Sequence, residues 1–236
     1  MNEYIIGGPA GNEAHNKIDK ARKLALPNLE DPISLYQKKA RFCQTTPEDS
    51  HLSVIFKLRE TFSNKCDYLE IGSLFGFSMV NATQSKTQGK FVGVDLFESS
   101  GKIFVNDYTP DISERNLSKS KTESLVDQCN IHNHEINFIK GNSQSNSTFS
   151  KVLNVSDHYD LMFLDGDHSF AGTFNDFKKY SPLLRKGGFL LFDDHDYDTI
   201  SSVMDIVKNM DGEYEWIDWP EYSPKFSGFF LKLIKD

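Results

Sequence analysis

Between residues 67 and 210 the sequence repeats one pattern five times, a short apolar run followed by a longer segment with helical spacing. The runs, which we expect to be strands, lie at 67–71, 91–95, 136–140, 159–164 and 188–193. The expected helices lie near 76–86, 113–131, 144–154, 170–183 and 198–210. Val, Ile, Leu and Phe fill the runs with little polar alternation, which is typical of parallel strands buried on both faces. Because right-handed crossovers join such strands, the pattern predicts a Rossmann-like, doubly wound α/β sheet.

The end of the sequence departs from this pattern. Residues 213–219 and 226–234 are two apolar and aromatic runs with no room for a helix between them. Two strands joined by a short connection pair antiparallel. We therefore expect a mostly parallel seven-stranded sheet that ends in an antiparallel strand pair.

The beginning of the sequence is expected to add helices to this sheet. Glycines and prolines are frequent over residues 1–30, which indicates an irregular arm. Helices are expected from Pro32 to Lys39 and from about Ser50 to Phe62. We divide the chain into residues 1–65, an arm and helices that cap the same domain, and residues 66–236, the ligand-binding domain.

Charge and composition exclude several classes of partner. The chain has 236 residues, a net charge of −8 and a pI near 5.4. Tight nonspecific binding to nucleic acid or to an anionic membrane needs a basic surface, so we expect neither partner. No apolar run is long enough to span a bilayer, and the N-terminus lacks the pattern of a secretory signal, so we expect a cytoplasmic protein. Cys43, Cys66 and Cys129 lack C-x-x-C spacing and are expected to be reduced thiols.

A glycine turn follows the first expected strand. The strand carries Glu70 and continues into Gly72-Ser73-Leu74-Phe75-Gly76, a G-x-x-x-G turn before a helix that begins near Ser78. Glycines let backbone N–H groups approach a ligand, and the helix N-terminus favours its negative end. The turn lacks the G-x-G-x-x-G of dinucleotide sites and the G-x-x-x-x-G-K-[ST] of nucleotide triphosphate sites.

Other polar residues follow the remaining strands, at the sheet edge where open α/β sheets bind ligands. Asp95 ends the second strand, where an acid is well placed to bind the ribose hydroxyls of a nucleoside cofactor. The third strand is followed by G-N-S-Q, which includes Ser143. The last two strands are followed by the acidic segments L-D-G-D-H and F-D-D-H-D, at 164–168 and 192–196.

The two acidic segments predict a metal site. Their carboxylates are expected to gather at one edge of the sheet, and they belong to Asp165, Asp167, Asp193, Asp194 and Asp196. Crowded carboxylates repel, and a divalent cation removes the repulsion. Oxygen ligands favour Mg²⁺, with Mn²⁺ or Ca²⁺ as alternatives. The competing interpretation is a set of helix caps and turn acids on a wet surface.

A histidine accompanies each acidic segment. His168 lies three residues beyond Asp165, and an imidazole with an ordinary pKa of about 6.5 suits a general base. His195 is the competitor for that role. The alternative for His168 is a loop histidine that only bonds the backbone.

Two stretches of the sequence resemble a known family. L-E-I-G-S-L-F-G-F-S, at 69–78, resembles the first motif of class I S-adenosylmethionine-dependent methyltransferases, and catechol O-methyltransferase carries a similar strand, turn and helix. L-D-G-D-H-S-F-x-G-T-x-x-D-F, followed by L-L-R-K-G-G-F-L-L-F-D-D-H, is similar to the macrocin O-methyltransferase and cephalosporin-hydroxylase-like branch. The resemblance covers about residues 66–195.

The resemblance implies a role for each matching residue. The cofactor-binding residues would be Glu70, Gly72 and Ser73 at the methionine amino group, Ser78 at its carboxylate, Asp95 at the ribose, Ser143 at the adenine, and Asp165. The metal ligands would be Asp165, Asp193 and Asp194, and His168 would be the catalytic base. Relatives often carry Glu-Asp or Asp-Asn where this chain has Asp193-Asp194.

The expected function is transfer of a methyl group from S-adenosyl-L-methionine to a hydroxyl of a small molecule. Sugar, polyketide and catechol-like acceptors all fit, with a divalent metal and a histidine base assisting. A homo-oligomer is compatible with the sequence. The alternatives are an NAD- or sugar-nucleotide-dependent oxidoreductase and a non-catalytic cofactor-binding protein.

Overall fold

The fold is built on one seven-stranded sheet. The computed structural model describes residues 9–24, 52–98, 118–210, 212–223 and 226–233. The strands are β1 (Tyr68–Ile71), β2 (Phe91–Asp95), β3 (Ile136–Lys140), β4 (Tyr159–Leu164), β5 (Leu184–Phe192), β6 (Tyr214–Ser223) and β7 (Phe226–Lys232). Their order across the sheet is β3-β2-β1-β4-β5-β7-β6. Strands β1 to β5 run parallel, and β7 pairs antiparallel with both β5 and β6. The predicted fold class is confirmed.

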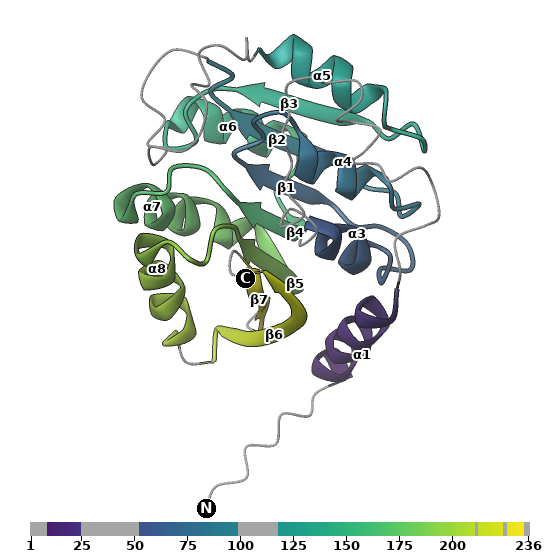
Figure 1. Cartoon of the computed structure of the whole chain (residues 1–236), viewed down its shortest axis with the longest axis vertical. Coiled ribbons are helices and arrows are strands. Elements are labelled where there is room, and N and C mark those ends of the chain that lie inside the picture. Colours follow the sequence, from purple (N-terminus) through teal and green to yellow (C-terminus); the bar gives the residue numbers. More distant parts are fainter. Residues whose placement is uncertain (1–8, 25–51, 99–117, 211, 224–225, 234–236) are drawn as a thin grey trace, which may run out of the picture.

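Helices cover both faces of the sheet (Figure 1). They are α1 (Pro9–Lys23), α3 (Ser53–Arg59), α4 (Phe77–Thr83), α5 (Lys119–Asp127), α6 (Asn146–Val155), α7 (Phe170–Tyr180) and α8 (Asp198–Lys208), with a 3₁₀ turn at Ser181–Leu183. One buried apolar cluster contains residues of α1, α3, α4 and α5, and the other contains residues of α6, α7 and α8. The molecule therefore has three layers, with the sheet in the middle.

Strand β1 shows why the apolar runs do not alternate. Tyr68 packs in one apolar cluster, whereas Leu69 and Ile71 pack in the other. Successive side chains of a strand point to opposite faces, so a strand with helices on both sides needs buried residues at every position. All four residues of β1 are buried, but Glu70 differs from the other three because its side chain is a carboxylate.

The expectation for the N-terminus is wrong over residues 9–23, which form helix α1. The start signal is Pro9 at the first helical position, and Lys20, Arg22 and Lys23 occupy the last turn. Ile18 and Ala21 are buried, and the Arg22 guanidinium donates to the Asp218 carbonyl at 2.7 Å. The helix expected at residues 32–39 lies outside the described residues.

Smaller differences concern element ends. β5 begins at Leu184, before the predicted residue 188, because Leu184 pairs with Tyr159 ahead of an irregularity in the ladder. β6 continues through Pro220 to Ser223. Proline is tolerated there because β6 is an outer strand, which pairs with a neighbouring strand on one side only. Among the described residues no helix is both long and apolar enough to cross a membrane.

Candidate functional site: the carboxyl edge of β1, β2, β4 and β5

The turns after β1 and β4 are in direct contact. The Gly72 backbone has a φ of +92°, and a Cβ atom added there would lie 1.8 Å from the Asp165 carbonyl oxygen. The Asp165 N–H donates to the Ile71 carbonyl at 2.8 Å. β2 and β3 lie on one side of β1, while β4 lies on the other, so strand order reverses at this point. Open α/β sheets bind ligands beyond the strand ends at such a reversal.

Glu70 is buried beside the glycine turn, and only one of its two carboxylate oxygens accepts hydrogen bonds. Its Oε2 accepts from the Tyr68 hydroxyl at 2.9 Å and from the Ser78 hydroxyl at 2.7 Å. Glu70 Oε1 and Ser73 Oγ are both buried and have no hydrogen-bond partner among the described residues. Burial raises the pKa of Glu70 to about 7, although the neighbouring hydroxyls oppose the shift. The turn thus presents an acceptor and a hydroxyl that a ligand's ammonium group would satisfy.

Ser78 differs from its predicted role in one respect. Its hydroxyl proton is donated to Glu70 Oε2, so no proton is left for a methionine carboxylate. In this structure Ser78 orients Glu70 from the first turn of α4.

Asp95 joins the end of β2 to the glycine turn. Its Oδ2 accepts from the Leu74 N–H at 2.9 Å, and its Oδ1 accepts from the Phe97 N–H at 2.7 Å. Burial raises the pKa of Asp95, and these backbone donors oppose the shift. Leu74 and Phe97 have φ values of 42° and 47°, in the left-handed region that non-glycine residues rarely adopt. Asp95 therefore lies at the end of β2, directly beside the glycine turn.

The turn after β3 is attached to the same edge. The Gly141 N–H donates to the Asp95 carbonyl at 2.9 Å. The Tyr180 hydroxyl, at the end of α7, donates to the Ser143 carbonyl at 2.8 Å. Ser145 then caps α6 by accepting from the Thr148 N–H. Ser143 is thereby held between β2 and α7.

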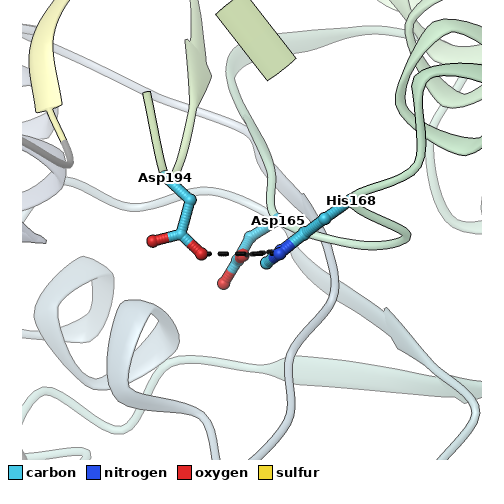
Figure 2. A group of neighbouring side chains, drawn as sticks. All are labelled: Asp165, His168 and Asp194. Carbon is cyan, nitrogen blue, oxygen red and sulfur yellow. Dashed lines mark hydrogen bonds and ion pairs between the residues drawn. The ribbon is translucent and has the colours of Figure 1, made fainter. Parts of the chain in front are cut away.

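Two of the predicted carboxylates and one histidine form a compact group. His168 Nε2 lies 3.1 Å from Asp165 Oδ1, and His168 Nδ1 lies 3.5 Å from Asp194 Oδ2. Figure 2 shows the three side chains converging, with the imidazole beside both carboxylates. One ligand atom of each lies within 4.8 Å of the others. Asp194 reaches this position with a φ of 49°.

Burial and neighbouring negative charge together set the pKa values of this group. Burial raises the pKa of Asp165, and the charge of Asp193 raises it further. Burial alone would lower the pKa of His168, but its hydrogen bond with Asp165 and the nearby carboxylates raise it to about 9. Burial is the larger cause for Asp165, whereas for His168 the neighbouring carboxylates outweigh burial. A group of this kind favours a cation, whether a proton or a metal ion.

The other predicted carboxylates are placed differently. Asp193 lies outside the compact group, although its charge acts on Asp165. Asp167 accepts from the Ser169 N–H at 2.9 Å and shapes the turn that begins α7. Asp196 is exposed. Of the five aspartates expected to lie together, Asp165 and Asp194 do so. Asp167 instead stabilises a turn, as the competing interpretation of turn acids expected.

The structure separates the two candidate histidines. The Ser227 backbone N–H lies 3.0 Å from His195 Nδ1 and can only donate, so Nδ1 accepts. His195 Nε2 then donates to the Phe192 carbonyl at 2.9 Å. The ring is buried and packs on Phe226, with 5.0 Å between centroids. His195 thus fastens the end of β5 to β7, whereas His168 faces the carboxylates.

Sequence reasoning missed the residues that position this site. Tyr68 holds Glu70, the Thr199 hydroxyl donates to the His168 carbonyl at 2.6 Å, and the Tyr197 ring lies 5.3 Å from the His168 ring. Tyr68 had a signal, because residues i and i+2 of a strand lie on one face. Tyr197 and Thr199 come from the start of α8, and no sequence spacing predicted their contact with the loop after β4.

A mostly parallel sheet with the order β3-β2-β1-β4-β5-β7-β6, in which β7 runs antiparallel, is the class I methyltransferase fold. Residues 69–195, more than half of the chain, match the family described as methyltransferase domain, and the chain belongs to that family. It is also 29% identical over 176 residues to the uncharacterized protein R132 of Acanthamoeba polyphaga mimivirus, a match that covers 74% of this chain and 71% of that protein.

Solved structures share the fold at low identity. The O-methyltransferase NovP has a TM-score of 0.57 at 14% identity, covering 94% of this chain and 98% of its own. An O-methyltransferase from Bacillus cereus has a TM-score of 0.57 at 13% identity, covering 96% and 100%. The methyltransferase CalS11 has a TM-score of 0.54 at 14% identity, covering 96% and 95%. At these identities the likeness shows the fold.

Proposed function

We propose that the protein transfers the methyl group of S-adenosylmethionine to a hydroxyl of a small molecule, assisted by a divalent cation and by His168. The observation that carries the proposal is the group of Asp165, His168 and Asp194 at the strand ends, in contact with the glycine turn through Gly72. Among the structural neighbours, CalS11 is described as a TDP-rhamnose 3'-O-methyltransferase, and the Bacillus cereus enzyme as a complex with SAH, S-adenosylhomocysteine. These descriptions support the cofactor and the hydroxyl acceptor.

The residues of the first turn fit the cofactor. The bare Glu70 Oε1 and the buried Ser73 hydroxyl would bind the methionine ammonium group, which satisfies both. Asp95, at the end of β2, would accept from the ribose hydroxyls, and Ser143 would lie at the adenine. When bound, the cofactor supplies an electrophilic methyl group on a sulfonium.

The donor set of the compact group fits a divalent cation. Asp165 and Asp194 offer hard carboxylate oxygens, for which Mg²⁺ is preferred and Mn²⁺ or Ca²⁺ are alternatives. A bound cation would lower the pKa of an acceptor hydroxyl. Asp193, next to this pair, would contribute through its charge.

His168 is assigned the proton of the acceptor. Asp165 holds Nε2–H at the shorter distance of 3.1 Å. A cation bound by the carboxylates would offset the negative charge that raises the pKa of His168 to about 9, so the imidazole would be neutral and Nδ1 could accept the proton. The two carboxylates then stabilise the imidazolium. The Thr199 hydroxyl and the Tyr197 ring restrain the His168 loop, so the base stays aligned.

Binding and turnover test the proposal separately. We expect calorimetry to detect S-adenosylhomocysteine binding, and Asp95→Ala to weaken it by at least about tenfold, since a bidentate contact to two hydroxyls is lost. Mass spectrometry should detect methyl transfer to catechol or sugar hydroxyls that stops in chelator and resumes with Mg²⁺. Asp194→Asn should abolish transfer, whereas the exposed control Asp196→Asn should retain it. Absence of S-adenosylhomocysteine binding would refute the cofactor, and full activity in chelator would refute the metal.

A further inference from the structure

Trp219, on β6, carries a buried donor that the proposed mechanism does not use. The residue is 2% exposed, and its indole Nε1 has no hydrogen-bond partner among the described residues. Leaving a buried N–H without a partner is costly, and buried polar atoms in native proteins are nearly always bonded. An indole nitrogen can only donate. The group that would satisfy Trp219 is therefore a hydrogen-bond acceptor, such as an oxygen.

Trp219 lies at the same edge of the sheet as the compact group. β6 runs parallel to β5, because each of them pairs antiparallel with β7 (Figure 1). Asp218 pairs with Gly228 of β7. Ser227, one residue nearer the carboxyl edge of β5, donates its backbone N–H to His195 Nδ1. Trp219, which follows Asp218, therefore reaches this edge at the level of His195.

Trp219 also lies on the face of the sheet that carries Glu70. Trp219 and Tyr68 belong to the same buried cluster, and Glu70, two residues after Tyr68 in β1, shares its face. Lys57, on α3, is buried, and its Nζ lies 5.8 Å from the centroid of the Trp219 ring. An N–H donor and a positive charge therefore lie together on the face that carries the proposed methionine site.

The strand order leaves one direction for the body of the acceptor. The residues proposed to bind the methionine and the ribose lie at β1 and β2, and the compact group follows β4 and β5. Beyond β5 the order continues with β7 and β6. An acceptor whose hydroxyl lies at the compact group would extend away from the cofactor, toward β6. Neighbouring strands are about 4.8 Å apart, so a small ring compound with one side group can span the roughly 10 Å from β5 to β6.

We propose that Trp219 and Lys57 select an acceptor that carries a carboxylate on the side opposite the methylated hydroxyl. The inference rests on the proposed function, which places that hydroxyl at the compact group. A carboxylate oxygen would accept from the Trp219 N–H, and the charge of Lys57 would stabilise the anion. An alkyl group at the same position would leave the indole N–H without a partner. The substrate class is therefore a hydroxy acid rather than a neutral hydroxyl compound.

The experiment compares 3,4-dihydroxybenzoate with 4-methylcatechol, which has a methyl group in place of the carboxylate. Calorimetry measures binding of each to the protein saturated with S-adenosylhomocysteine and Mg²⁺. Wild type is expected to bind the acid at least about tenfold more tightly, the scale of one charge-assisted hydrogen bond. Trp219→Phe keeps an aromatic ring but removes the N–H, and Lys57→Met keeps an unbranched chain but removes the charge. Each should reduce the preference to about threefold or less.

The matched control is Trp216→Phe, on the opposite face of β6, where the indole N–H already donates to Asp218. Its preference should match wild type. If wild type does not bind S-adenosylhomocysteine, the proposed function fails. If the cofactor product binds but the acid is not preferred, or if folded Trp219→Phe keeps the full preference, the selection of a carboxylate is overturned and the cofactor assignment stands. Should Trp219→Phe not fold, an undiminished preference in Lys57→Met overturns the proposal.

Discussion

At the scale of single residues, Glu70 shows how a sheet can keep a functional carboxylate inside its core. Tyr68 and Ser78 both donate to Oε2, which concentrates the protein's own donors on one oxygen. The other oxygen has no hydrogen-bond partner among the described residues. This arrangement costs stability, which a cationic group bound there would restore, because the buried acceptor would then be satisfied.

The raised pKa of Glu70 makes a prediction about stability. A carboxyl whose pKa is about 7 when folded and ordinary when unfolded stabilises the fold below its unfolded pKa, and that contribution is lost as pH rises toward 7. Glu70→Gln removes the titration, so it should gain stability relative to wild type between pH 5 and pH 8, on the order of 3 kcal/mol. Urea unfolding across this range measures it. The exposed control Glu135→Gln should run parallel to wild type, and parallel curves for Glu70→Gln would contradict the assignment.

At the scale of elements, the loops after β4 and β5 bring Asp165, His168 and Asp194 together, and neighbouring elements hold these loops in place. His195 ties the last residue of β5 to β7 through both ring nitrogens, one residue away from Asp194. His168 is tied through its backbone to α8 by Thr199. Two histidines in similar acidic segments therefore have different surroundings, since His195 is packed between β5 and β7 whereas His168 faces two carboxylates.

Paired substitutions should separate these tasks. His195→Ala removes the hydrogen bonds of the ring with Phe192 and Ser227 and its contact with the Phe226 ring, so urea unfolding should show a loss of about 2–4 kcal/mol. Its methyl transfer, measured at a temperature where it remains folded, should stay close to wild type. His168→Ala should show the reverse, little loss of stability and loss of transfer. Equal stability of His195→Ala and wild type would argue against the role of His195 in joining β5 to β7.

At the scale of the whole molecule, α1 completes one face of the sheet. Ile18 is 2% exposed and joins the apolar cluster shared by α3, α4 and α5. The polar side of α1 meets the C-terminal strands, where His15 lies 3.1 Å from Glu215 and Arg22 donates to the Asp218 carbonyl. The first described helix and the last strand pair thus support each other.

Removing the apolar anchor of α1 should weaken the whole fold. Ile18→Ala leaves a cavity in the main apolar cluster and should cost about 2–4 kcal/mol, seen as a lower midpoint in urea with an unchanged slope. Asn16→Ala, at an exposed position of the same helix, should be close to neutral. A neutral Ile18→Ala would mean that α1 does not belong to the cooperative unit.

The sequence predicted the sheet well because its strands are unbroken apolar runs and its crossovers have one allowed hand. It did not predict α1, because glycines and prolines near residues 7–11 indicated a loop and few apolar residues marked the helix face. The ligand edge was predictable from strand ends, since parallel strands finish together. It was not predictable which of Asp193 and Asp194 joins the group with His168, because Asp194 does so with a φ of 49°. The contact of Tyr197 with His168 depends on packing between distant segments.

The contact between α1 and the β6–β7 pair also bears on how the protein is made. During synthesis the segment of α1 leaves the ribosome well before residues 214–232. Part of the surface that receives α1 therefore does not exist when α1 is made. Until β6 and β7 are made, the side of α1 that contacts them stays exposed, and a chaperone that shields short amphipathic segments could bind it.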